Sequence, residues 1–421
     1  MIKRATLKNG IRVLGASMKS TQAFTVLVLV RAGSKYETKY TNGTAHYLEH
    51  MIFKGSKDYP SVRAITETLD GLGAEYNAFT AKELTGYWVK VAGSNASRAL
   101  KIVASMLEKP LFPAQEFERE RGVVLEEINM YFDTPARFIF DLWEEVLWGD
   151  QPAGWHVAGT PKIIKNLKRE ALLEYFQKHY VGRSSVVVMA GAMDNSIFTH
   201  ARKLFSGIRT GETSQHPKVR EEQKKPAAHL HFKRTDQTHL AVGFRGVSME
   251  HPARYALSVL AAILGGTMSS RIFLEVRDKL GLAYSIRTQA SFDTESGYLV
   301  TSAGVRNEKV SDAIGAILNE YRRITKTSPG ATEVKKAKDA MIGHFVLDLE
   351  QTDEVASYIG TQETLLGKIT EPEAEIRRLR KVTSHDVVRA ARTYFRPERL
   401  NLALIGPFRN PRVFNAMLNK F

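Results

Sequence analysis

The segment VLVLVRAGS occupies residues 26–34, and the related segment LAVGFRGVS occupies residues 240–248. Each begins with an apolar run and passes through an arginine to a glycine and a serine, and Arg31 and Arg245 lie 214 positions apart. A short apolar run that ends near glycine is typical of a buried β-strand followed by a turn. The recurrence of this strand indicates that one fold occurs twice in the chain.

A second pair of segments repeats at nearly the same distance. Tyr180 is followed by VVVMAG at residues 186–191, and Tyr394 is followed by LNLALIG at residues 400–406, which gives an offset of 214 or 215. Two pairs of segments with one spacing predict that the chain consists of two homologous halves.

The two halves are predicted to meet in a polar segment at residues 210–226. This segment is rich in charged and polar residues and contains Pro217 and Pro226. Such a composition is typical of a solvent-exposed linker. Since 421 residues are too many for one ordinary core, we predict one domain at residues 1–209 and a homologous domain at residues 227–421.

Strand and helix patterns are mixed within each half. Residues 74–80 and 85–91 have the pattern of two strands of a hairpin, and Ser61 precedes apolar residues that recur every three or four positions, as in a capped helix. A long helical pattern begins at Ala114. Hairpins without regular β-α-β alternation predict an α+β fold, in which each half places helices on one face of a largely antiparallel sheet.

The first repeated strand is followed by GTAHYLEHMIF at residues 43–53, which contains the pattern H-x-x-E-H. In a helix, His46 and His50 would share one face, and this spacing allows two imidazoles to bind one metal ion. Glu49 would lie near the same face. A carboxylate beside a metal ion can take a proton from water, so the segment predicts two metal ligands and a general base.

Two histidines leave a zinc ion short of a third protein ligand. An acidic residue on a neighbouring apolar helix is a suitable donor, and Glu126 and Glu127 on the helix from Ala114 are the candidates. Helical periodicity alone does not choose between them.

The second half lacks the metal-binding pattern. At the repeat offset, the positions of His46, Glu49 and His50 correspond to three apolar residues, namely Leu260, Ile263 and Leu264. The second half is therefore predicted to keep the fold without the metal site.

The amino-acid composition excludes several kinds of catalytic and metal-binding site. The chain is 43% hydrophobic and 25% charged and contains no cysteine, so a packed globular protein is expected. Disulfides, thiol catalysis and cysteine metal sites are excluded. Any zinc would be held by histidine and carboxylate, a donor set more typical of catalytic than of structural sites.

The sequence predicts neither a membrane-spanning helix nor an export signal. No run of about 18 apolar residues occurs, which argues against a membrane-spanning helix. The basic start of the chain leads into Asn9-Gly10, a typical hairpin turn, and not into the apolar core of a signal peptide. We therefore expect a soluble, cytoplasmic protein without a membrane partner.

The formal net charge is +15, which raises the question of nucleic-acid binding. The positive charges are spread along the chain without a zinc finger, an aromatic RNA-binding motif or a basic arm, so a solvated basic surface and no nucleic-acid partner are expected. His216, His229, His231 and His239 lie near the linker, but no helical pair with a nearby acid occurs among them. They are predicted to be ordinary surface histidines.

Taken together, these residues resemble the zinc peptidases with an inverted motif, a family that includes pitrilysin, insulin-degrading enzyme and the mitochondrial processing peptidase. The resemblance covers nearly the whole chain and is to the bacterial two-domain members. It rests on His46, Glu49 and His50, on the duplicated halves, on NAFT at residues 77–80 and on RDKLGLAY at residues 277–284.

The resemblance also implies roles for acidic residues downstream of the motif. In this family the third zinc ligand lies 76 or 77 residues beyond the second histidine and seven residues beyond another glutamate. Glu127 lies 77 residues beyond His50 and seven beyond Glu120, so the resemblance implies that Glu127 is the ligand and Glu120 its outer partner. Glu126 also falls within the spacing.

Substrate contacts are implied in the same way. The family resemblance assigns the strand with Asn77, Ala78, Phe79 and Thr80 to pairing with extended substrate. It assigns Arg277 and Tyr284 to contacts with the substrate and the transition state, where a guanidinium and a phenol can donate to carbonyl oxygens and to a developing oxyanion.

The implied function is that of a zinc metalloendopeptidase which hydrolyses peptides or unfolded segments inside a clamshell chamber, with Glu49 as the general base. The alternative is a non-catalytic structural or assembly subunit, because this family also contains members without the zinc motif. Larger relatives carry four homologous domains and this chain has two, so the resemblance implies a homodimer in which the second half of each chain completes the site of the other.

Overall fold

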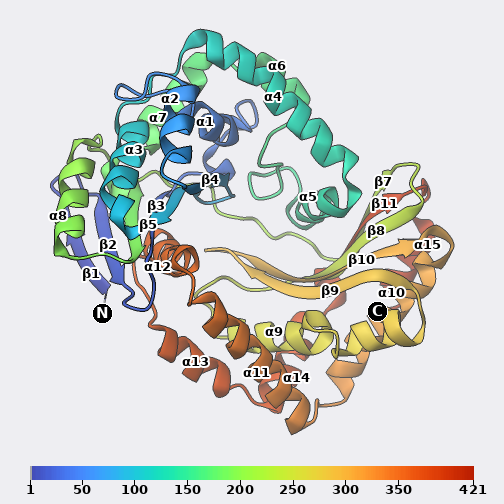
Figure 1. Cartoon of the computed structure of the whole chain (residues 1–421). Coiled ribbons are helices and arrows are strands. Elements are labelled where there is room, and N and C mark those ends of the chain that lie inside the picture. The colour runs from blue at the N-terminus through green and yellow to red at the C-terminus, as the bar shows by residue number, and fades with distance from the viewer. Residues whose placement is uncertain (1) are drawn as a thin grey trace. The chain divides into compact units, whose positions relative to one another are not determined.

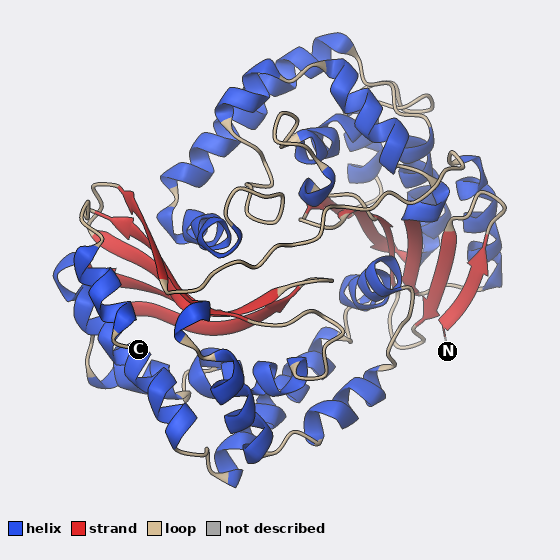
Figure 2. Ribbon diagram, turned by 180° about the vertical axis from the view of Figure 1, so that it is seen from behind, coloured by secondary structure: helices blue, strands red, loops and turns tan. Residues whose placement is uncertain are grey.

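The computed structural model describes residues 2–421 and divides into two compact units. The first unit comprises residues 1–129, 155–217 and 346–369, and the second comprises residues 130–154, 218–345 and 370–421. Each unit combines one sheet with many helices (Figures 1 and 2), which confirms the predicted α+β class and its duplication. The boundaries 1–209, 210–226 and 227–421 therefore describe the sequence halves and not the packing units.

The sheet of the first unit contains six strands within the described residues, in the order β1-β2-β6-β3-β5-β4. Their bounds are β1 Ile2–Thr6, β2 Arg12–Ser17, β3 Ala23–Val30, β4 Glu75–Thr80, β5 Thr85–Ala92 and β6 Ser185–Gly191. Only the β2–β6 pair is parallel among these strands. Gly10 adopts a positive φ of 88° between β1 and β2, as the predicted hairpin turn requires.

The helices of the first unit surround this sheet. They are α1 Thr44–Ile52, α2 Val62–Asp70, α3 Ala96–Glu108, α6 Pro161–Asn166, α7 Arg169–His179, α8 Asn195–Leu204 and α12 Thr352–Leu366, together with most of α4 Ala114–Asp133. The predicted cap of α2 is present, because the Ser61 hydroxyl accepts a hydrogen bond from the Ala64 amide at 3.2 Å. Gly71 follows the last residue of that helix.

The sheet of the second unit has the strand order β7-β11-β8-β10-β9 within the described residues. The strands are β7 Ala227–Phe232, β8 Gln237–Arg245, β9 Ala283–Phe292, β10 Gly297–Arg306 and β11 Leu400–Gly406. Its helices are α5 Pro135–Trp148, α9 Arg254–Ala261, α10 Val310–Lys326, most of α11 Ala331–Asp348, α13 Pro372–Arg380, α14 Ser384–Tyr394 and α15 Arg412–Asn419. Again only one pair of described strands, β7–β11, is parallel.

Helices of the same half cover one face of each sheet, as predicted, but the opposite face is covered as well. In β3, every residue from Phe24 to Val30 is buried, so both faces of this strand are packed. Leu27 and Leu29 belong to an apolar cluster with Ala356 and Ile359 of α12. A helix from the second half of the sequence therefore covers the open face of the first sheet.

Polar contacts also attach α12 to the first sheet. The hydroxyl groups of Thr25 and Thr352 lie 2.7 Å apart and are buried. The guanidinium of Arg12 donates to the Glu363 carbonyl at 3.0 Å. These contacts fix the start and the later turns of α12 on β3 and β2.

The second unit shows the reciprocal arrangement. Trp143 of α5 is fully buried in an apolar cluster with Ala241, Val300 and Ala403 of the second sheet. The Arg245 side chain donates to the Leu147 carbonyl at the end of α5. Each sheet therefore receives one helix from the other half of the sequence, and α4 and α11 are the helices that lead into the exchanged segments.

No helix among residues 2–421 combines the length and the apolar character that crossing a bilayer requires.

Truncation of Ile359 to alanine tests the exchanged helix. The side chain is 4% exposed against the first sheet, so Ile359→Ala should lower the free energy of unfolding by about 2–5 kcal/mol, through lost burial and a residual cavity. Glu354→Ala on the exposed side of the same helix should change it by about 0.5 kcal/mol or less. Urea unfolding followed by circular dichroism measures both, and equal small effects would mean that α12 does not pack on this sheet.

Candidate metal centre

The helix with the H-x-x-E-H pattern is fixed at its first turn by a buried carboxylate. Glu37 is 5% exposed, and its Oε2 accepts hydrogen bonds from the Gly43 amide at 2.8 Å and the Asn42 side chain at 2.9 Å. Its Oε1 accepts from the Ala45 amide at 2.6 Å. The backbone amides of Gly43 and Ala45 belong to the amino-terminal end of α1, where orphan N–H groups and the helix dipole favour a negative charge. Burial raises the pKa of Glu37 to about 8, although these hydrogen bonds act in the opposite direction.

The residue before α1 has to be glycine. Gly43 has a positive φ of 97°, which side chains with a Cβ rarely adopt. A Cβ at this position would also lie 2.6 Å from the carbonyl oxygen of Ala158. Next to it, the Asn42 amide donates to the His156 carbonyl at 2.9 Å, so the start of α1 is held against the segment that precedes α6.

His46, His50 and Glu127 converge in the structure. The Nε2 atom of His46 lies 3.5 Å from Oε1 of Glu127, and Nε2 of His50 lies 3.2 Å from Oε2 of the same carboxylate. One ligand atom from each residue can be chosen so that all three lie within 4.8 Å of one another. This is the only group of three or more potential metal ligands within residues 2–421.

The docking of α4 on α1 brings Glu127 to the histidines. The ring of Tyr47 on α1 packs on Phe117 of α4 with centroids 4.8 Å apart, and its hydroxyl donates to the Phe117 carbonyl. Ten residues later, Glu127 points toward the two histidines, whereas Glu126 is exposed. This packing turns Glu127, and not Glu126, toward the two histidines.

Glu120 and Lys54 support His50 from behind. The Nδ1 atom of His50 lies 2.9 Å from Oε1 of Glu120, and the Lys54 ammonium lies 2.5 Å from Oε2 of that carboxylate. A hydrogen bond at Nδ1 fixes the ring so that Nε2 faces Glu127. Burial alone would raise the pKa of Glu120, but the hydrogen bonds from His50 and Lys54 lower it below its usual value. The part played by Lys54 was missed in the sequence, although it follows His50 by one helical turn.

The two carboxylates also change the protonation of His50. Its burial lowers the pKa, but hydrogen bonds to Glu120 and Glu127 outweigh burial and raise the pKa of His50 to about 9. Hydrogen bonds from His46 and His50 hold the pKa of Glu127 well below its usual range. The buried Nδ1 atom of His46 has no hydrogen-bond partner within the described residues.

These residues fit a zinc ion by the chemistry of their donors. Two imidazole nitrogens and one carboxylate are the ligands of catalytic zinc sites, where a fourth position stays open. Here Nε2 of His46, Nε2 of His50 and the oxygens of Glu127 are directed toward one another, and Glu120 supplies the hydrogen bond to a ligand histidine that such sites use.

Glu49 lies on the same helix but outside this group. Its Oε2 accepts a hydrogen bond of 2.6 Å from the Thr80 hydroxyl. Thr80 is the last residue of β4, which is the edge strand of the first sheet. The motif helix and the edge strand are therefore joined through the predicted base.

The other residues predicted to bind substrate lie on the same edge strand. In β4, Asn77 and Phe79 are exposed and Ala78 is partly buried, and 37% of Phe79 is accessible to solvent. One side of β4 pairs with β5, and the other side has no strand partner within residues 2–421. Its backbone can accept a further strand there.

Arg277 and Tyr284 lie close together in the second unit. Arg277 belongs to the π-helical segment Phe273–Lys279, and Tyr284 is the second residue of β9. The guanidinium lies 5.8 Å from the centre of the Tyr284 ring, and this ring is 77% exposed. An arginine and a phenol are thus presented side by side to solvent on this unit.

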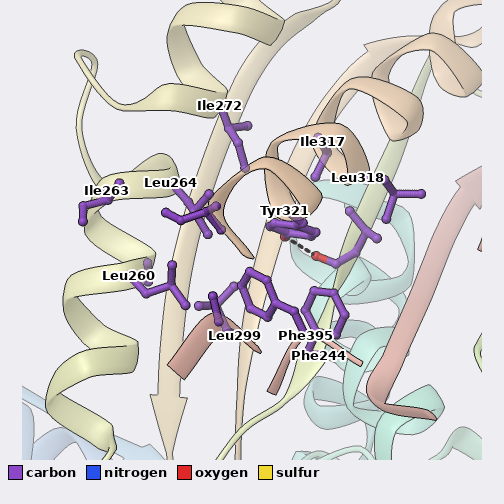
Figure 3. Close-up of a cluster of buried hydrophobic side chains, with 14 of the residues drawn as sticks. Phe244, Leu260, Ile263, Leu264, Ile272, Leu299, Ile317, Leu318, Tyr321 and Phe395 are labelled. Atoms are coloured by element: carbon purple, nitrogen blue, oxygen red, sulfur yellow. Dashed lines mark hydrogen bonds between the residues drawn. The ribbon is translucent and has the colours of Figure 1, made fainter. Parts of the chain in front are cut away.

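The second unit has an apolar core where the first has its metal ligands. Leu260, Ile263 and Leu264 are at most 3% exposed and belong to a cluster with Phe244 and Tyr321 (Figure 3). The partly buried Met341, at the offset position of Glu127, packs against the same cluster. The prediction that this half lacks a metal site agrees with this packing.

The prediction of surface histidines is wrong for His216. Its side chain is 5% exposed and lies 3.7 Å from the Glu83 carboxylate. Its ring also packs edge-on against Tyr36 at 5.2 Å. The polar composition of residues 210–226 did not reveal these contacts, because Tyr36 and Glu83 are far from His216 in the sequence. His229, His231 and His239 are partly buried on β7 and β8, and within residues 2–421 they form no metal-binding group.

Comparison with known proteins finds two family models in the chain. The model described as insulinase (peptidase family M16) matches residues 12–161, and the model described as peptidase M16 inactive domain matches residues 166–341. An uncharacterised zinc protease, YmxG, of Bacillus subtilis (strain 168) is 33% identical, over 97% of this chain and 99% of the relative. An uncharacterised zinc protease of Rickettsia bellii (strain RML369-C) is 30% identical, over 95% and 96% respectively.

Solved structures share the fold at lower identity. A protease from Helicobacter pylori has a TM-score of 0.91 at 22% identity and covers 97% of this chain and 99% of its own. A chain of complex III2 from Candida albicans has a TM-score of 0.84 at 18% identity, with 99% of both chains covered. The length and identity of the sequence matches show that this chain is a two-domain member of peptidase family M16.

Proposed function

We propose that the chain is a zinc metalloendopeptidase that hydrolyses peptides or unfolded protein segments. The observation that carries the proposal is the convergence of His46, His50 and Glu127, with Glu49 on the same helix. The relatives are named zinc proteases, and these names support the same activity.

The chemistry of hydrolysis follows from this arrangement. A bound zinc ion would polarise the scissile carbonyl and lower the pKa of a water molecule. Glu49 accepts the proton of the attacking water as the C–O bond forms, and passes it to the nitrogen of the leaving amine as the C–N bond breaks. Glu120 and Lys54 keep the His50 ring in its orientation throughout.

Substrates are proposed to bind as an added strand along β4. The free edge of this strand offers backbone N–H and C=O groups to an extended peptide. A compact protein cannot present such a segment without local unfolding. Peptides and unfolded segments are therefore the expected substrate class.

The second unit is proposed to complete the site of another chain. Arg277 and the exposed Tyr284 are the groups that would donate to the substrate and to a developing oxyanion. Larger relatives contain four homologous domains and this chain contains two. A closed chamber of the family type would therefore require a second copy of the chain. We propose a homodimer in which each zinc site works with the partner subunit's Arg277 and the partner subunit's Tyr284.

A second candidate function is a non-catalytic structural or assembly role. A chain of complex III2 from Candida albicans has this fold, so the fold is found within a larger assembly. The presence of His46, Glu49, His50 and Glu127 favours catalysis here, because an assembly role needs none of them.

Substitutions at His50 and Glu49 separate metal binding from proton transfer. His50→Ala should lose most of the zinc and the activity, because it removes one of three protein ligands. Glu49→Gln should keep about one zinc per chain and lose at least about a hundredfold in kcat on an unfolded protein substrate. Metal analysis and cleavage assays measure the two effects, and equal zinc loss in both variants would contradict these roles.

Adjacent glutamates provide a matched test of the third ligand. Glu127→Gln should abolish tight zinc retention, whereas Glu126→Gln should bind zinc like the wild type, because only Glu127 faces the histidines. Competition with a chromophoric chelator gives the affinities. The reverse order would show that Glu126 is the ligand.

Subunit mixing tests the composite site. A Glu49→Gln chain and an Arg277→Ala/Tyr284→Phe chain should each be nearly inactive. After random subunit exchange, about half of the dimers should be mixed and each should carry one complete site, so activity should return to about a quarter of the wild-type value. Demonstrated exchange without recovery would mean that Arg277 and Tyr284 do not serve the zinc site of a partner.

A further inference from the structure

The hydrogen bond from Thr80 to Glu49 holds the base of the proposed reaction. The Thr80 hydroxyl donates to Oε2 of Glu49 at 2.6 Å across 31 positions of sequence. Within residues 2–421 the Glu49 carboxylate has no other hydrogen bond or ion pair. One oxygen of the carboxylate is therefore fixed by the protein, and the other is left for a different partner.

The position of the Thr80 hydroxyl is itself well fixed. Thr80 pairs with Thr85 at the closed end of the β4–β5 hairpin, and the Ala81 amide donates to the Leu84 carbonyl at 2.8 Å to close the turn. The Thr85 hydroxyl donates to the Ala32 carbonyl at 2.8 Å, just after β3. A β-branched side chain has few χ1 rotamers, so this anchored hairpin directs the Thr80 hydroxyl at α1.

We propose that Thr80 is a positioning residue, whose hydroxyl orients the Glu49 carboxylate for proton transfer from the attacking water. The inference rests on the proposed function, since it assigns Glu49 a proton to accept. A glutamate has three rotatable side-chain bonds and would otherwise sample orientations that face away from the water. Fixing one oxygen removes that freedom before the substrate arrives.

The same bond links substrate binding to the base. The strand that carries Thr80 is the free edge along which an extended peptide would pair through its backbone. The backbone groups of β4 can serve the peptide while the Thr80 side chain serves Glu49. A peptide seated on β4 therefore lies in a fixed relation to the carboxylate that has to act on it.

Three roles of Thr80 make different predictions. A side chain that binds substrate affects KM. A side chain that only stabilises the hairpin affects unfolding. A side chain that orients the base affects kcat, with KM and zinc content unchanged.

The experiment compares Thr80→Val, Thr80→Ser and Thr25→Val in the full chain with zinc bound and an unfolded protein as substrate. Thr80→Val keeps the shape of the side chain and removes the donor, so kcat should fall about ten- to a hundredfold while KM changes less than about twofold. Thr80→Ser restores the donor and should recover most of kcat. Thr25→Val removes a buried hydroxyl from β3 of the same sheet, where it bonds to the Thr352 hydroxyl, and should lower the melting temperature without this loss of kcat.

A second measurement needs no activity. In the zinc-free chain, Glu49→Ala, Thr80→Val and the double variant form a cycle of urea unfolding midpoints. If the two side chains contact one another, the double variant should shift the midpoint by less than the sum of the single shifts. The unfolding cycle reports the contact between Thr80 and Glu49 even if the wild type has no peptidase activity. A lack of activity would overturn the proposed function, and the two results can therefore be told apart.

Several results would overturn the inference. These are an unchanged kcat in Thr80→Val, a rise in KM with kcat unchanged, no recovery in Thr80→Ser, or additive midpoint shifts in the cycle. A loss of zinc in Thr80→Val would also overturn it, since the effect on turnover would then come from the metal site.

Discussion

The fold depends on the burial of both faces of its two sheets. Antiparallel sheets often leave one face to solvent, but β3 and β8 carry apolar residues on both faces. Helices of the same half cover one face of each sheet. The chain covers the other face by exchanging α5 and α12, so that neither sheet is complete without a helix from the other half. A fragment that ended in the linker would lack α12 and expose Leu27 and Leu29 to water.

The candidate metal site is built on the first of these sheets from three separate elements. α1 supplies His46, Glu49 and His50, α4 supplies Glu127, and β4 supplies the partner of Glu49. Glu37 fixes the beginning of α1, and the packing of Tyr47 on Phe117 fixes α4 beside it. In the second half, the equivalent positions are filled by leucine, isoleucine and methionine in a continuous core. At these positions the same scaffold therefore holds ionisable side chains in the first half and apolar side chains in the second.

Local signals in the sequence were sufficient for much of this arrangement. The prediction that His46 and His50 share one face needed only a helix. The cap at Ser61 and the turn at Asn9-Gly10 depend on residues only a few positions away in the sequence. Helical periodicity did not choose between Glu126 and Glu127, because that choice depends on how α4 docks on α1.

The remaining features depend on distant partners. An apolar helix face shows that a helix is covered but not by which sheet, so the exchange of α12 could not be predicted. Glu37 lies six residues before Gly43, outside the spacing of ordinary caps. His216 and the bond between Thr80 and Glu49 likewise need the folded chain, since no local pattern records which side chains meet.

The two carboxylates beside His50 favour its protonated form. Protonated His50 lies between two carboxylates, 2.9 Å from Glu120 and 3.2 Å from Glu127, and these hydrogen bonds raise its pKa to about 9 despite burial. Because the folded pKa lies above the ordinary value of 6.5, this arrangement contributes stability that is fully present below about pH 6.5 and is lost as pH rises toward 9.

A metal ion bound at Nε2 of His50 would compete with that proton for the same nitrogen. Its binding would require the proton to leave, so metal affinity at this site would rise with pH over the range in which His50 deprotonates. The hydrogen bond from Nδ1 of His50 to Glu120 would be kept, because a metal ion would take only the other nitrogen. Glu120 and Lys54 therefore orient the His50 ring through Nδ1, and Nε2 is the nitrogen at which a metal ion would replace the proton.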